Sequence, residues 1–186
     1  NQAQAAERIP VPMPGENTET QEKRETRKRL IEWAKEFDLG QGDDAEKWIE
    51  ESFKFLPSGE AVCKGDLWLP HDVNRMPKGI VRVAGNLFNR ELTSAQGFEL
   101  PEVIGVSLWL DGLTLAQGLK LPQVIGHHLI LDGLTSIQGL ELPQKVGGNV
   151  YLSNVTDEEI QQLRNKYPNL CINPKREGCF DIGVPR

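Results

Sequence analysis

The chain has 186 residues, of which 38% are hydrophobic and 26% charged, and its formal net charge at pH 7 is −6. This composition is that of a globular protein with a core of ordinary size, and its acidic balance argues against nucleic acid and anionic membranes as partners. No apolar run approaches the ~20 residues of a membrane-spanning helix, so we expect no membrane insertion, and the localisation stays open between cytoplasm and secretion.

The first segment, residues 1–17, carries Pro10, Pro12 and Pro14 among many polar residues and little apolar content. A segment of this composition cannot bury enough apolar surface to fold by itself. It therefore predicts an extended or disordered arm.

Residues 18–57 predict an N-terminal helical cap. Apolar residues recur at helical spacing in two runs, Leu30, Trp33, Ala34 and Phe37, and then Ala45, Trp48, Ile49, Phe53 and Leu56. Gly40 ends the first helix, while Asp43 with Glu46 resembles a capping box and Pro57 closes the second helix. Two such helices before a repeat array are expected to cover the apolar end of its first coil.

Residues 58–155 predict a repeat solenoid. Gly105–Pro122 and Gly126–Pro143 have the same residue at most positions, at a spacing of 21 residues. One unit of this length cannot bury its own apolar edge, so a fixed period in the twenties indicates stacked coils. An earlier coil keeps the register, and the first coil is one residue shorter.

Each coil contains a short strand. Leu108-Trp109-Leu110 alternates with period two, so the leucines point into the coil and Trp109 points out. The predicted fold class is α+β, a leucine-rich-repeat-like solenoid with one parallel strand per 21-residue coil. The predicted strands are 65–69, 86–90, 107–111, 128–132 and 149–153. A right-handed β-solenoid is the alternative fold.

Residues 156–186 predict a C-terminal capping helix and tail. Thr156 with Glu159 three positions later forms a capping box, and Ile160, Leu163 and Tyr167 follow on one face. A polar helix at this place would close the apolar end of the last coil. In the tail, Cys171 and Cys179 would form a disulfide bond in an exported protein and remain two thiols in a reducing cytosol.

The pattern Leu-x-Leu, Leu-Thr and Leu-Pro on a period near 20 resembles the short bacterial leucine-rich repeat. Helices before the repeats also resemble the layout of leucine-rich-repeat effectors secreted by bacterial pathogens. The resemblance implies a domain that recruits a protein target for a catalytic domain elsewhere in the chain. It departs from the family where Gly112 and Gly133 replace an Asn whose side chain bonds neighbouring coils, and only Asn154 matches.

No residues with the pattern of a catalytic, cofactor or metal site were found. His127 and His128 have no cysteine or further ligand at workable spacing, so we expect no metal. Asp111 and Asp132 should be neighbours about 4.8 Å apart, a pair that can serve acid–base chemistry. Duplication of a surface residue is the simpler account, and Arg90 in the preceding coil would neutralise Asp111.

The predicted binding site is the outer face of the strands. Four of the five outward positions are aromatic, whereas only 6% of the chain is, and they are Trp68, Phe88, Trp109, Ile130 and Tyr151. Two polar rows flank this row: Asp66, Asn86, Ser107, His128 and Asn149 on one side, and Arg90, Asp111, Asp132 and Ser153 on the other. We expect the aromatic row to anchor the ligand. The register of the ligand along the sheet is expected to be set by Arg90, Asp111, Asp132 and His128. An aromatic stripe with a polar rim is typical of an interface hot spot. The alternatives are that the row stacks for stability alone, or is covered by the arm or by a second copy of the chain.

The first functional hypothesis is a non-catalytic module that binds a protein or peptide on this face, with no cofactor. The second is the target-recruitment domain of a bacterial effector or enzyme whose catalytic part lies outside this chain. The third is a structural spacer or adhesin stalk. A uniformly small and polar sheet face would favour this hypothesis, and the outward residues of this chain are not of that kind. Self-association through the aromatic row is the alternative to a foreign partner.

Overall fold

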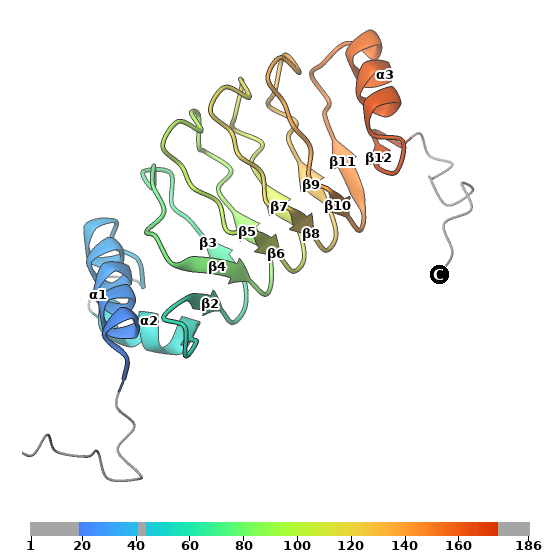
Figure 1. Ribbon diagram of the computed structural model, residues 1–186. Coiled ribbons are helices and arrows are strands. Elements are labelled where there is room, and N and C mark those ends of the chain that lie inside the picture. The colour runs from blue at the N-terminus through green and yellow to red at the C-terminus, as the bar shows by residue number, and fades with distance from the viewer. Residues whose placement is uncertain (1–18, 41–43, 175–186) are drawn as a thin grey trace, which may run out of the picture.

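The computed structural model describes residues 19–40 and 44–174. They form a solenoid of stacked coils with short parallel strands and with helices at both ends (Figure 1). The predicted mixed fold with coils of about 21 residues is therefore confirmed. The predicted arm at 1–17 and the end of the predicted tail lie outside the described residues.

Helix α1, Gln21–Glu36, begins at the N-cap Thr20, whose side chain accepts a hydrogen bond from the Lys23 amide. Its predicted apolar face is buried, and Leu30 and Trp33 are 0% exposed. The Trp33 indole N–H donates to the Arg75 carbonyl at 2.9 Å, which ties the helix to the first coil. The helix thus packs against the N-terminal end of the solenoid (Figure 1).

Helix α2, Ala45–Ser52, is shorter than the sequence suggests. Asp44 caps it by accepting from the Lys47 amide, whereas the predicted cap Asp43 lies outside the described residues. The chain then becomes strand β1, Phe53–Phe55, where buried and exposed residues alternate. Phe53 lies at helical spacing from Ile49 and also alternates with Phe55 as in a strand, so the sequence allows both structures. The residues form a strand because they pair with the next strand of the chain.

The coils build two sheets, one more than predicted. Sheet A contains β1, β2 (Ala61–Cys63), β4 (Ile80–Val83), β6 (Val103–Ile104), β8 (Val124–Ile125) and β10 (Lys145–Val146) in that order. Sheet B contains β3 (Leu67–Trp68), β5 (Leu87–Phe88), β7 (Leu108–Trp109), β9 (Leu129–Ile130), β11 (Asn149–Tyr151) and β12 (Cys171–Ile172). The prediction of one strand per coil accounts for sheet B and missed sheet A.

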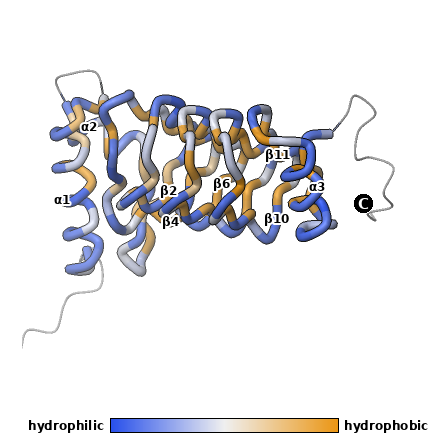
Figure 2. The backbone as a smooth tube through the Cα atoms, turned by 90° about the horizontal axis from the view of Figure 1, so that it is seen from above, coloured by the Kyte–Doolittle hydropathy of each residue, from blue (hydrophilic) through white to orange (hydrophobic). Residues whose placement is uncertain are grey.

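The predicted register is confirmed in sheet B. Leu87 pairs with Leu108 and Leu108 with Leu129 in parallel neighbouring strands. All three are 0% exposed, and the hydrophobic residues recur at corresponding positions of successive coils (Figure 2). At about 25 cal/mol per Å² of buried apolar surface, these repeated columns are the main source of stability.

Glycines stand where successive coils touch backbone to backbone. A Cβ on Gly105 would lie 2.1 Å from the Ala84 carbonyl oxygen, and one on Gly126 would lie 2.0 Å from that of Gly105. A side chain at these positions would therefore push the coils apart. Gly112 is likewise required by close approach, with 2.4 Å between such a Cβ and the Arg90 oxygen.

Helix α3, Asp157–Lys166, has the predicted capping box between Thr156 and Glu159. Glu159 also accepts from the Ile137 amide at 2.8 Å, and the Leu142 amide donates to the Tyr167 hydroxyl at 3.1 Å. These two bonds hold α3 against the preceding coil. Backbone hydrogen bonds to the carboxylate lower the pKa of Glu159.

Two expectations from the sequence concern a disulfide bond near the C-terminus and the absence of a membrane-spanning helix. Cys171 takes part in a disulfide bond, while Cys179, the proposed partner, lies outside the described residues. No helix within the described part of the chain is long and apolar enough to cross a bilayer.

Candidate functional site

The outer face of sheet B carries the predicted aromatic row. Parallel pairing places each outward side chain beside its counterpart in the next coil, giving Trp68, Phe88, Trp109, Ile130 and Tyr151 in sequence. The residues on either side of Trp109, Leu108 and Leu110, are fully buried. The row is therefore fixed by the same alternation that forms the core.

The rings at the N-terminal end stack along the solenoid axis. The centroids of Trp68 and Phe88 are 3.7 Å apart at an interplanar angle of 13°. Phe88 and Trp109 continue the stack at 5.8 Å and 23°. Since the ring faces are turned toward one another, Phe88 presents mainly its edge to an incoming molecule.

Exposure divides the row into parts. Trp68 is 63% exposed, the largest exposed fraction among the bulky apolar side chains of the described residues, whereas Ile130 is only 5% exposed. Ile130 thus separates the three stacked rings from Tyr151, whose ring meets His128 edge to face at 5.4 Å. The structure brings together Trp68, Phe88 and Trp109, but not all five residues in one exposed surface.

The upstream polar row is a hydrogen-bonded ladder that joins the coils. Each side chain accepts a hydrogen bond from a backbone amide one coil later. The Asn86 amide donates to Asp66 at 2.7 Å, the Ser107 amide to Asn86 at 3.0 Å, the His128 amide to Ser107 at 3.0 Å, and the Asn149 amide to His128 at 2.9 Å. These amides lie at strand starts and would otherwise lack a partner inside the sheet. Sequence reasoning identified the row but assigned it to the rim of a binding site.

His128 differs from the other members of the ladder because it titrates. Its Nδ1 accepts from the Asn149 amide, so the proton of the neutral ring lies on Nε2. Partial burial lowers the pKa of His128, and repulsion from His127 lowers it further. Protonation of Nδ1 would replace the acceptor with a donor and break this bond.

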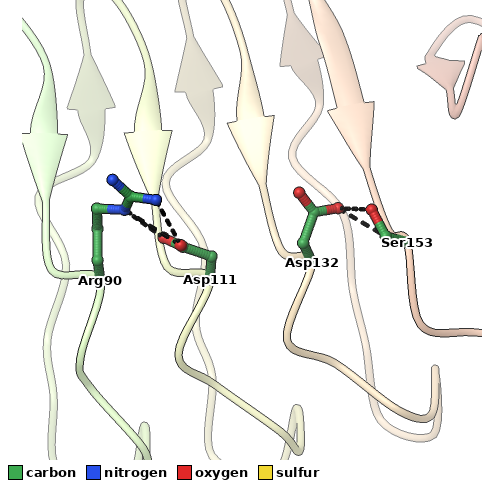
Figure 3. Close-up of polar contacts among 4 residues, drawn as sticks. All are labelled: Arg90, Asp111, Asp132 and Ser153. Carbon is green, nitrogen blue, oxygen red and sulfur yellow. Dashed lines mark hydrogen bonds and ion pairs between the residues drawn. The ribbon is translucent and has the colours of Figure 1, made fainter.

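The downstream polar row joins neighbouring coils in two pairs of residues. The Arg90 guanidinium donates to both carboxylate oxygens of Asp111 at 3.1 to 3.2 Å, as the sequence predicts, and Asp132 accepts from the hydroxyl and amide of Ser153 (Figure 3). The hydrogen bonds and charge of Asp111 raise the pKa of Arg90. Arg90 also lies 5.4 Å from the Trp109 ring centroid. Asp111 and Asp132 therefore have separate partners.

Asn89 is a buried polar residue that sequence reasoning missed. It is 0% exposed and occupies the inward position that Leu110 and Leu131 hold in the following coils. Its amide nitrogen lies 3.5 Å from the Val73 carbonyl oxygen, and its Oδ1 has no partner. The available signal was an asparagine in a column of leucines, beside the irregular first coil.

Within the described residues, no group of three or more His, Cys, Asp or Glu side chains is arranged to hold a metal ion. Comparison of the chain with protein-family models, with curated proteins and with solved structures found no match.

Proposed function

We propose that the chain is a non-catalytic protein-interaction module, and that it binds a protein or peptide on the outer face of sheet B. The observation that carries this proposal is the exposed aromatic stack, in which Trp68 is 63% exposed and lies 3.7 Å from Phe88. Burying such a ring against a partner would release about 25 cal/mol per Å² of apolar surface.

The shape of the stack suits an extended or convex partner. Phe88 and Trp109 offer ring edges in a row, and Trp68 offers one open ring face at the end. Aromatic side chains at interfaces act as anchors when surrounding groups exclude water. Leu115 is also exposed, at 56%, but it lies outside the row and supplies a control.

The polar groups beside the stack would set the register of the partner. Arg90 and Asp111 form a half-exposed ion pair next to Trp109, and Asp132 lies one coil further along. Charges at the rim of an interface affect orientation and association rate more than affinity. The upstream ladder contributes little to binding in this account because its acceptor atoms are already used.

We also propose kinship with bacterial leucine-rich-repeat proteins, as a module for target recruitment. Asn154 supports it, because its side-chain amide donates to the Asp132 carbonyl in the preceding coil at 2.7 Å. Gly112 and Gly133 lack that contact, and the two-sheet coil favours the wider class of β-solenoids. A long reading frame on the C-terminal side of this chain would support the recruitment role.

The test compares Trp68→Ala with Leu115→Ala, because both remove an exposed apolar side chain. Partners are captured by cross-linking to the full chain and identified by mass spectrometry, and affinity for each is then measured. Trp68→Ala and the double change Trp109→Ala, Tyr151→Ala should lower affinity at least ~10-fold. Leu115→Ala should leave it unchanged.

Circular dichroism separates binding from folding in the same variants. A folded double variant with undiminished capture would remove the row from the binding site. Loss of the fold in the double variant would show that the row serves stability. The affinity of Trp68→Ala would then be the test of binding by the row. Sedimentation at increasing protein concentration would show self-association if a second copy is the partner.

A further inference from the structure

The outer face of sheet A carries a row of side chains that we call the cationic row. Pairing between neighbouring strands sets one residue of each strand in line along the solenoid, and these residues are Lys54, Val62, Arg82, Val103, Val124 and Lys145. Their chain neighbours Phe53, Cys63 and Ile104 are buried, so the row itself faces outward. The three cationic residues are exposed, and the three valines are partly buried.

The three cations of this row are not neutralised by a neighbouring carboxylate. Elsewhere in the chain a cation such as Arg90 forms an ion pair, in that case with Asp111. Among residues 19–40 and 44–174, the side chains of Lys54, Arg82 and Lys145 form no ion pair and no hydrogen bond. Their charges are therefore available to a partner.

The flanks of the cationic row carry little negative charge. On the side toward sheet B, the coils meet at one alanine and three glycines, Ala84, Gly105, Gly126 and Gly147. On the other side, Glu60 and Glu102 directly precede strands of sheet A but form no ion pair with the row within the described residues. The row is thus a positive surface on a chain whose formal net charge is −6, and it should attract acidic groups.

The length of the row suits a short extended segment of polypeptide. With strands about 4.8 Å apart, Lys54 lies about 10 Å from Arg82, and Arg82 about 14 Å from Lys145. An extended segment of about seven residues covers the total of about 24 Å. The valines between the cations offer apolar contact, which suits a partner that has both acidic and apolar side chains.

A nucleic acid matches this row less well. Duplex DNA carries one charge per about 1.7 Å, whereas the row offers three cations over about 24 Å. A dense polyanion would also be repelled by the negative net charge of the chain, and it would cover the valines without an apolar group to contact them.

We propose that the cationic row binds an acidic polypeptide segment that also carries apolar residues. Carboxylates of the segment would meet Lys54, Arg82 and Lys145, while its apolar side chains would pack on the valines. The cationic row shares no residue with the aromatic row of sheet B. This inference therefore does not depend on the proposed function.

Peptide titration of the full chain, followed by NMR at low salt, tests the proposal. The probe is a synthetic peptide of repeated Glu-Ser-Val units, whose carboxylates lie about 10 Å apart in an extended chain, and its uncharged counterpart has Gln in place of Glu. The acidic peptide should shift the signals of Val62, Val103 and Val124 and leave the Trp68 indole signal in place. Trp68→Ala should bind this peptide unchanged, which separates the test from that of the proposed function.

Two matched variants show whether position or total charge matters. Arg82→Gln with Lys145→Gln removes charge from the row and should weaken binding of the acidic peptide at least ~5-fold. Lys120→Gln with Lys166→Gln removes the same charge from exposed sites outside the row and should change affinity less than ~2-fold. Circular dichroism of both variants should match that of the unmodified chain.

Four results would overturn the proposal. Valine signals that do not shift, or equal binding of the uncharged peptide, would show that the row does not recognise acidic segments. Equal losses in the two double variants would assign the attraction to total charge. Tighter binding of a duplex oligonucleotide, abolished by Arg82→Gln with Lys145→Gln, would assign the row to nucleic acid. A dimer in sedimentation that the same double change dissociates would assign it to a second copy of the chain.

Discussion

The upstream polar row and the aromatic row come from the same strands and lie two residues apart, yet their surroundings differ. Ser107 is 3% exposed and its hydroxyl accepts from the His128 amide, whereas Trp68 is 63% exposed and stacks on Phe88 of its own row. The side chains of the upstream polar row form hydrogen bonds between coils, whereas the aromatic row leaves apolar surface exposed. Position on one sheet face therefore does not decide whether a residue serves structure or binding.

The downstream row lies between these extremes. Arg90 and Asp111 join neighbouring coils as the ladder does, but they do so through side chains alone and at the surface. An exposed ion pair contributes little to stability, about 0.2 to 1 kcal/mol. The comparison predicts that substitutions become steadily less damaging from the backbone contacts to the ladder and then to the downstream row.

The largest effect is expected where coils touch through backbone alone. Gly126→Ala would place a Cβ 2.0 Å from the Gly105 oxygen, so the coils must separate and both rows lose their register. We expect a loss of several kcal/mol, or failure to fold, in urea unfolding. Gly139, with φ of +75° and no atom near its Cβ position, is the control, and Gly139→Ala should cost only about 1 to 2 kcal/mol. Equal losses at both positions would contradict the close-approach argument.

The next effect distinguishes the ladder from the downstream row. Ser107→Ala removes a buried acceptor and leaves the His128 amide without a partner, which should lower the free energy of unfolding by about 1 to 3 kcal/mol. Ser153→Ala changes the same residue type at an exposed site. It removes the hydroxyl that donates to Asp132 but keeps the backbone amide that donates to the same carboxylate, so its cost should be below about 0.5 kcal/mol. Denaturant unfolding measures both. Similar losses would mean that the ladder is no more structural than the downstream row.

A smaller effect should depend on pH. Because the pKa of His128 is lower in the folded than in the unfolded chain, the unfolded chain binds more protons between the two values. Stability from the bond to Asn149 should thus be complete above about pH 6.5 and decrease as the pH falls through the folded pKa. Unfolding midpoints measured from pH 7.5 to 5 check this expectation.

The control for that titration is His128→Asn, which keeps an acceptor in the ladder as Asn86 does. Its stability should lack the His128 component of the pH dependence. An unchanged pH profile in this variant would show that other groups titrate in this range.

The smallest effect is expected for the downstream ion pair. Arg90→Ala should change the free energy of unfolding by less than about 1 kcal/mol, since the Arg90 side chain is 56% exposed. The same change should slow partner association more at low salt than at high salt, because salt screens the interaction. Stopped-flow binding at two salt concentrations tests this, and a large loss of stability would contradict it.

Much of sheet B could be predicted because identical residues recur at one spacing. Leu108 and Leu129 pair as expected, and Thr156 caps α3 as its sequence indicates. Arg90 also meets Asp111 as expected, since a residue spacing of 21 places side chains in adjacent coils. Repetition of this kind fixes a column of contacts without knowledge of the rest of the fold.

Other features have no comparable signal. Val124-Ile125 in sheet A is too short for alternation to be recognised. The ladder uses Asp, Asn, Ser and His, which share an acceptor atom but no identity, so residue repetition does not reveal it. The exposure of Ile130 could not be predicted either, because it depends on how its larger neighbours pack across the row.

The central claim is that the aromatic row binds while the ladder stabilises, and one paired measurement tests it most directly. Trp68→Ala and Ser107→Ala are each measured for unfolding free energy and for affinity to the captured partner. We predict that Trp68→Ala loses at least ~10-fold in affinity with less than about 1 kcal/mol of stability, and that folded Ser107→Ala shows the reverse. Undiminished affinity in Trp68→Ala, or an equal loss of affinity in folded Ser107→Ala, would contradict the claim.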